Sequence, residues 1–163
     1  MADLTKAGPS LMARRMSPQQ AGTGLREFLS FRLGADVYAV ELARIREIVS
    51  SPPVTEVPRS PSEVIGICSV RGLLVTVVDL RLRLGLPAAP PTKLSRILLA
   101  NTDSGEVVGL LVDEVRHVVR LSSAEIELSA SVLGADLSDH VLGVGRPEGD
   151  FVVLLDLASM VET

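Results

Sequence analysis

The feature that most constrains the fold of this chain is an internal repeat. A shift of 77 residues places residues 64–67 (VIGI) on residues 141–144 (VLGV), and without a gap it also places Asp79 on Asp156. A shift of 70 residues places residues 37–40 on residues 107–110 and Ile45 on Val115. Because several glycine, aspartate and apolar positions repeat in order, each half is predicted to carry one copy of the same structural unit.

Each copy, roughly residues 26–86 and 95–162, is too short to bury a comfortable core alone. We therefore expect two small β-barrels that share one apolar seam. The expected fold class is all-β with short helices.

Apolar periodicity predicts the elements of both copies. Alternation or short apolar runs predict strands at residues 29–33, 37–40, 64–70, 73–80, 97–100, 107–112, 141–144 and 151–155. Helical spacing of apolar residues predicts short amphipathic helices at residues 42–49, 113–119 and 158–161. Loops are expected at the proline-rich residues 50–62, at residues 87–91 and at residues 120–140.

Composition narrows the classes of function. The net charge is −4, and one Tyr, three Phe and no Trp offer few stacking platforms, so nucleic acid is not an expected partner. A lone Cys68 cannot form an internal disulfide. Residues 1–24 read as a mobile tail without a signal peptide, and no apolar run is long enough to span a membrane. A cytoplasmic protein is expected.

No pattern of residues indicates catalysis, a cofactor or a metal. Gly-rich phosphate loops are missing, and Ser69 lies outside any GxSxG motif. Two histidines, His117 and His140, are too few for a zinc site. Because Asp79 and Asp156 follow apolar strands in both copies, a repeated turn or cap role is favoured over a catalytic dyad. The chain is therefore expected to be a non-catalytic binding protein.

Four ordered blocks resemble the CheW family of chemotaxis coupling proteins. They are REFLSFRLGADVYAVELARIREIV (26–49), VIGICSVRGLLVTVVDLRLRLGL (64–86), VVGLLVDEVRHVV (107–119) and VLGVGRPEGDFVVLLDLASMV (141–161). The resemblance covers nearly all of residues 26–162 and implies one CheW-like domain over residues 25–163. One departure is Ser69, which stands where the family has the Asn of an Asn-Leu-Arg-Gly turn. Serine lacks the two-sided hydrogen bonding of the amide, which puts that turn's contacts in doubt.

The resemblance implies two five-stranded, SH3-like β-barrels and an adaptor that couples methyl-accepting chemoreceptors to a CheA-type histidine kinase. Partners would be the kinase's regulatory domain, the receptors and other CheW-like domains, with no direct insertion into the membrane. Three alternatives stay open: a paralogue serving gliding motility or development, a β-barrel module that binds a small ligand, and an enzyme that uses Asp79. Neighbouring genes, a deep pocket and loss of turnover would distinguish them.

The candidate partner-binding residues lie mainly in the first copy. They are Ile45, Glu47, Ser69, Arg71 and Gly72, with Ile97 and Val118 from the second copy. Ile45 can equally be a core residue, and Arg71 can equally cap carbonyls in its turn. We also predict that Glu47 and Arg71 form an ion pair. The shifts place His117 and Glu148 at the two equivalent positions, so the pair is expected in one copy only and points to a function of that copy.

Overall fold

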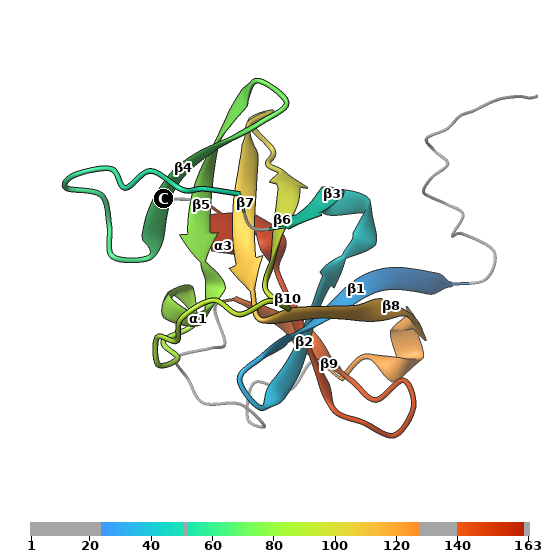
Figure 1. The fold of residues 1–163 in the computed structure, drawn as a ribbon. Helices are drawn as coiled ribbons and strands as arrows, with labels where there is room; N and C mark the ends of the chain where they lie inside the picture. The colour runs from blue at the N-terminus through green and yellow to red at the C-terminus, as the bar shows by residue number, and fades with distance from the viewer. Residues whose placement is uncertain (1–23, 51, 128–139, 162–163) are drawn as a thin grey trace, which may run out of the picture.

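A computed structural model describes residues 24–50, 52–127 and 140–161. Residues 1–23 of the predicted N-terminal tail (1–24) and residues 128–139 of the predicted loop at residues 120–140 lie outside these ranges. Within these ranges, ten strands form two five-stranded sheets, with two short α-helices and two 3-10 turns (Figure 1). This architecture confirms the predicted fold class of mostly β structure with short helices.

Sheet A has the strand order β8-β1-β2-β10-β9. Its strands are β1 (Leu25–Leu33), β2 (Asp36–Glu41), β8 (Glu114–Ser122), β9 (Val141–Gly145) and β10 (Val152–Leu155). Sheet B has the order β3-β6-β7-β5-β4. Its strands are β3 (Ile45–Ser50), β4 (Val64–Val70), β5 (Leu73–Asp79), β6 (Arg96–Asn101) and β7 (Val107–Val112). Helix α1 (Leu80–Arg83) follows β5, α3 (Leu157–Val161) follows β10, and the 3-10 turns are η2 (Leu42–Arg44) and η3 (Ser123–Glu125).

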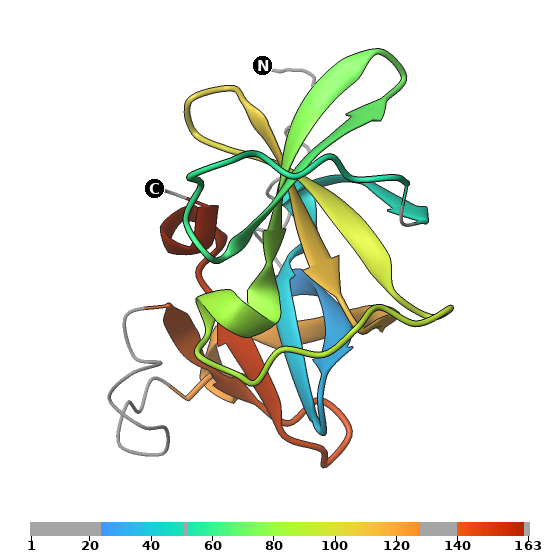
Figure 2. The ribbon, with the colours of Figure 1, turned by 60° about the vertical axis from the view of Figure 1, so that its left-hand side comes forward.

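Each sheet combines strands from both copies of the repeat. Sheet A takes the β1–β2 hairpin from the first copy and β8, β9 and β10 from the second, while sheet B takes β6–β7 from the second copy and the rest from the first. The chain therefore crosses from sheet A to sheet B at η2, and from sheet B back to sheet A between β7 and β8 (Figure 2). One copy of the repeat is not one sheet, because the copies exchange their first hairpins.

The strand registers repeat as the sequence shifts predict. The parallel pair Thr76↔Val108 in sheet B is matched by Val153↔Tyr38 in sheet A. Both antiparallel hairpins also carry a register shift at the equivalent place, after Val64 in β4 and after Val141 in β9. The two sheets are therefore built on one backbone plan.

Two of the predicted helices are wrong. Residues 45–50 form strand β3, preceded only by the η2 turn, and residues 114–122 form strand β8, which also absorbs the start of the predicted loop. Both strands contain a register shift, between Ile45 and Glu47 in β3 and beside Val115 in β8. Such a bulge adds a residue to the strand's period of two and imitates helical spacing. Helix α1, in contrast, was not predicted, and the terminal helix is confirmed as α3.

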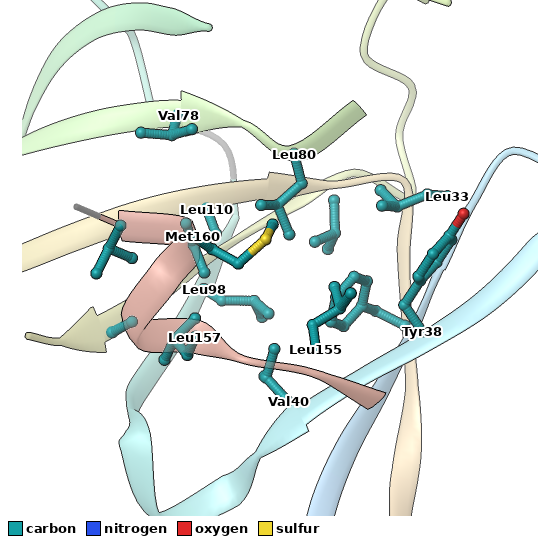
Figure 3. Close-up of a cluster of buried hydrophobic side chains, with 14 of the residues drawn as sticks. Leu33, Tyr38, Val40, Val78, Leu80, Leu98, Leu110, Leu155, Leu157 and Met160 are labelled. Carbon is teal, nitrogen blue, oxygen red and sulfur yellow. The ribbon is translucent and has the colours of Figure 1, made fainter. Parts of the chain in front are cut away.

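A shared apolar core lies between the two sheets, as expected from the short copies. It contains side chains from both sheets and both helices, among them Leu33, Val78, Leu98, Leu155 and Met160 (Figure 3). Two smaller clusters lie on the faces of the sheets that are turned away from this shared core, around Phe28 in sheet A and around Val75 in sheet B. We call the shared cluster the seam. Burial of large apolar side chains at the seam ties the two sheets into one cooperative unit.

Candidate functional site

The turn between β4 and β5 carries the family-like Arg-Gly pair. Arg71 has φ +52° and Gly72 has φ +82°, so both central residues of this two-residue loop lie in the left-handed region. That combination is typical of a type I′ hairpin turn, whose twist suits the flanking strands. A Cβ at Gly72 would meet nothing within 4 Å, so the backbone angle, not crowding, requires glycine here. The turn presents the Arg71 side chain to solvent.

The predicted ion pair between Glu47 and Arg71 is confirmed. Arg71 Nη1 donates to Glu47 Oε1, joining the β4–β5 turn to edge strand β3 at the other end of sheet B's strand order. The hydrogen bond from Arg71, aided by the charges of Arg71 and Arg46, lowers the pKa of Glu47. The same bond raises the pKa of Arg71. Because the Arg71 side chain stays largely exposed, the pair braces a surface that a partner can reach.

The equivalent place in the second copy has different chemistry. His117 and Glu148 are both exposed there, and the backbone of His117 exchanges hydrogen bonds with the Ser30 hydroxyl (2.6 and 3.2 Å). The second hairpin instead holds an Arg146–Glu127 ion pair at 3.1 Å. The same fold therefore forms in sheet A without a copy of the Glu47–Arg71 pair, which makes the pair a feature of one surface and not a requirement of the fold.

Large apolar side chains are exposed at equivalent places in the two copies. Ile48 on β3 (42% exposed) matches Val118 on β8 (36%). Leu74 on β5 (71% exposed) matches Phe151 beside β10 (40%), and the Arg146 guanidinium lies 5.5 Å from the Phe151 ring. Exposed apolar residues that recur at matched positions point to contact surfaces more strongly than scattered ones do. Sequence reasoning missed Ile48, Leu74 and Phe151, although the 70- and 77-residue shifts could have paired them.

The remaining predicted partner-binding residues differ in how far their side chains are buried. Ile45 is half-buried and packs against the seam. Ser69 is exposed opposite Leu74, close to the turn of Arg71. Ile97 is fully buried in the core of sheet B, so its side chain cannot contact a partner, and its assignment as a contact residue is wrong. An apolar residue on a central strand, which has a neighbouring strand on each side, is usually buried in the core.

The repeated aspartates cap the two short helices. Asp79 Oδ1 accepts a hydrogen bond from the Arg81 amide (2.9 Å), and Asp156 Oδ1 accepts one from the Ala158 amide (3.2 Å). Burial raises the pKa of Asp79 despite its amide donors. This confirms the predicted cap role. Within the described ranges, no cluster of His, Cys, Asp and Glu could hold a metal ion, and no helix is long and apolar enough to cross a membrane.

Comparisons with known proteins agree on one family. Residues 27–163 match the CheW-like domain. The chain is 34% identical to the "Chemotaxis protein CheW" of Rhizobium meliloti, covering 84% of this chain and 88% of the relative, and 29% identical to that of Thermotoga maritima, covering 85% and 90%. A crystal structure of the scaffolding protein TtCheW from Thermoanaerobacter tengcongensis matches with a TM-score of 0.78 at 26% identity, covering 85% of this chain and 93% of that one. The chain thus belongs to the CheW-like domain family, and the relatives it matches are the non-enzymatic CheW scaffold proteins of chemotaxis.

Proposed function

We propose that this chain is an adaptor that couples methyl-accepting chemoreceptors to a CheA-type histidine kinase. The observation that carries the proposal is the Glu47–Arg71 pair, which lies on an exposed surface within a family of chemotaxis scaffolds. A scaffold of this kind does no chemistry. It controls the kinase by contacting one kinase state better than another. We place it in the cytoplasm, at receptor arrays that it reaches through its partners.

The surface around the ion pair has the composition of a contact site. Exposed Leu73 and Leu74 follow the Arg71 turn, and exposed Ile48 is the neighbour of Glu47 on β3, on the other face of that strand. Apolar side chains would supply affinity, whereas the ordered guanidinium and carboxylate would set the register of the partner. This combination supports the first-copy surface as the main binding site.

The second copy offers a like surface elsewhere on the molecule. Val118 and Phe151 occupy the places of Ile48 and Leu74, but His117 and Glu148 replace the ion pair. Two related but unequal surfaces are what head-to-tail assembly requires, since each end must accept a different neighbour. We therefore include other CheW-like domains, such as the kinase's regulatory domain, among the proposed partners.

The test is a binding assay of the full chain with the kinase and with a receptor cytoplasmic tip. Glu47→Gln and Arg71→Gln are measured singly and together, and Arg146→Gln serves as the matched control from the other hairpin. We expect both single variants to weaken binding and the double variant to add little, because each change breaks the same pair. Strictly additive losses would exclude the pairing mechanism. Failure of the wild-type chain to bind either partner at micromolar concentration would overturn the adaptor function.

A further inference from the structure

Helix α1 carries charges that its counterpart α3 lacks. The sequence of α1 is Leu-Arg-Leu-Arg, and Leu80 is fully buried in the seam. Arg81 and Arg83 are the polar residues of the helix, and both bind groups outside it. At the equivalent places α3 has Ala158 and Met160. The two helices therefore occupy like positions with different chemistry.

Arg81 forms an ion pair with Asp113, the residue at which the chain crosses from sheet B to sheet A. Its Nε and Nη2 atoms donate to both oxygens of Asp113 (2.9 and 2.5 Å). Asp113 lies between β7 and β8, and its Oδ2 also accepts from the Gly34 amide (2.7 Å) in the β1–β2 turn of sheet A. Bidentate arginine–carboxylate pairs are directional and strong. Together the three residues link α1, the crossover and sheet A.

Further hydrogen bonds lie near α1, on the same side of the molecule as the Arg81–Asp113 pair. The Asp113 amide donates to the Arg32 carbonyl on β1 (3.1 Å), and Arg32 Nη1 donates to the Gly34 carbonyl (2.7 Å). Arg83 Nε donates to the Met160 carbonyl (2.9 Å), which connects α1 to α3. Arg81 thus binds the crossover that leads into sheet A, and Arg83 binds the helix that follows β10 of sheet A.

The other crossover is built differently. The 70-residue shift places Ala43 of η2 where the second copy has Asp113, so no carboxylate is available there for an arginine. The ion pair beside η2, Arg44–Asp103 at 2.7 Å, connects η2 to the β6–β7 turn within sheet B. Leu157 and Met160 of α3 are apolar and lie in the seam together with Val40, a residue of β2, the strand that leads into η2 (Figure 3). Apolar packing resists separation but is less directional than a bidentate ion pair.

We propose that the contacts of α1 form a clamp that holds the two sheets together on one side of the molecule. This side acts as a hinge, and the sheets change their separation on the opposite side, between β3 and β8. Figure 1 shows α1 at one side of the molecule and β3 and β8 at the other. Ile48 on β3 pairs with Leu98, and Val118 on β8 pairs with Leu29, both seam residues, so the exposed apolar side chains border the seam there. The inference deepens the proposed function, since a partner held at this border would set the angle between the sheets.

The experiment measures the distance between spin labels on the full chain. Cysteines replace the exposed Arg46 on β3 and Arg116 on β8, in a Cys68→Ser background that removes the native thiol. Without partner, Asp113→Asn and Arg81→Gln are expected to broaden the distance distribution. Arg44→Gln, which breaks an ion pair within one sheet, is expected to leave it unchanged. A distribution in the clamp variants identical to that of the parent would overturn the proposal.

A second arm adds a receptor cytoplasmic tip or the kinase's regulatory domain to the labelled parent. A shift of the mean distance on binding is expected, and binding without any shift would overturn the hinge. If neither partner binds, the proposed function fails, while the clamp is still judged by the partner-free arm. Arg81→Lys, which keeps the charge but loses the two-pronged geometry, gives a milder clamp variant should Arg81→Gln fail to fold. Thermal unfolding by circular dichroism verifies that each labelled chain is folded.

Discussion

The two copies of the repeat differ in their charges and agree in their backbone. Both copies use a capping aspartate, Asp79 or Asp156, and both hairpins have the same register shift and the same parallel neighbour. Only the first copy has the Glu47–Arg71 pair and the arginines of α1. The duplicated features serve folding, and the unduplicated ones mark where the copies have acquired separate tasks. Five measurements can break or sharpen this distinction.

The largest effect is expected at Gly66, which supports the shared backbone plan. A Cβ there would lie 2.1 Å from the Thr55 carbonyl oxygen, and Thr55 itself bridges to Ile67. Because backbone cannot yield as a flexible side chain can, Gly66→Ala should cost about 3 kcal/mol or more in free energy of unfolding. Urea denaturation measures it. The control is Gly72→Ala, where space is open and only the left-handed backbone opposes the change, at about 1 kcal/mol; equal losses would refute the steric argument.

The second effect concerns the clamp of the first copy. The Arg81 and Asp113 side chains are 17% and 20% exposed, so removing one partner leaves a largely desolvated charge. Asp113→Asn should lower the free energy of unfolding by about 2 to 3 kcal/mol, less than for a fully buried pair. Thermal and urea unfolding measure the loss. A variant as stable as the parent would mean that the two crossovers are energetically alike.

The pH dependence of stability gives an independent test of the Arg81–Asp113 clamp. Burial alone would raise the pKa of Asp113, but the hydrogen bonds from Arg81 and Gly34 and the charge of Arg32 outweigh it and lower the pKa. Its contribution is therefore complete above the unfolded pKa of about 3.9 and is lost as the pH falls through the folded value. The stability difference between parent and Asp113→Asn should shrink below about pH 4. A difference that stays constant through this range would contradict the assignment.

A smaller and symmetrical effect is expected at the helix caps. Asp79→Ala and Asp156→Ala each remove an acceptor for a helix amide and should each cost about 1 kcal/mol. Similar losses in urea unfolding would support a structural role shared by the copies. A loss at one aspartate several times that at the other would show that the duplicated position has also diverged.

The smallest effect on stability is expected at the Glu47–Arg71 pair. Both residues lie at the surface, where solvent screens the attraction. Glu47→Gln and Arg71→Gln should leave the melting temperature unchanged within error, even where they weaken partner binding. A clear drop in melting temperature would assign the pair to folding and weaken the case for a binding surface.

Patterns in the sequence were sufficient for the parts of this protein that depend on local or repeated chemistry. The shifts identified the equivalent strands and the capping aspartates, and they showed that the predicted Glu47–Arg71 pair, which the structure contains, has no counterpart in the second copy. These features follow from residue types at fixed spacing. The helices expected at residues 42–49 and 113–119 failed because bulged strands imitate helical periodicity, and only pairing with β6 and β1 reveals the strand.

The sequence by itself determined that there are two like units, a β-rich class and a family of chemotaxis scaffolds. Only the tertiary structure decided that the units exchange their hairpins, that Ile97 is buried, and that Arg81 reaches Asp113 across a crossover. The physical reason is that periodicity records which face of a strand is apolar but not which strand will pair beside it. Partner strands and long-range ion pairs are chosen by how the whole chain buries its seam.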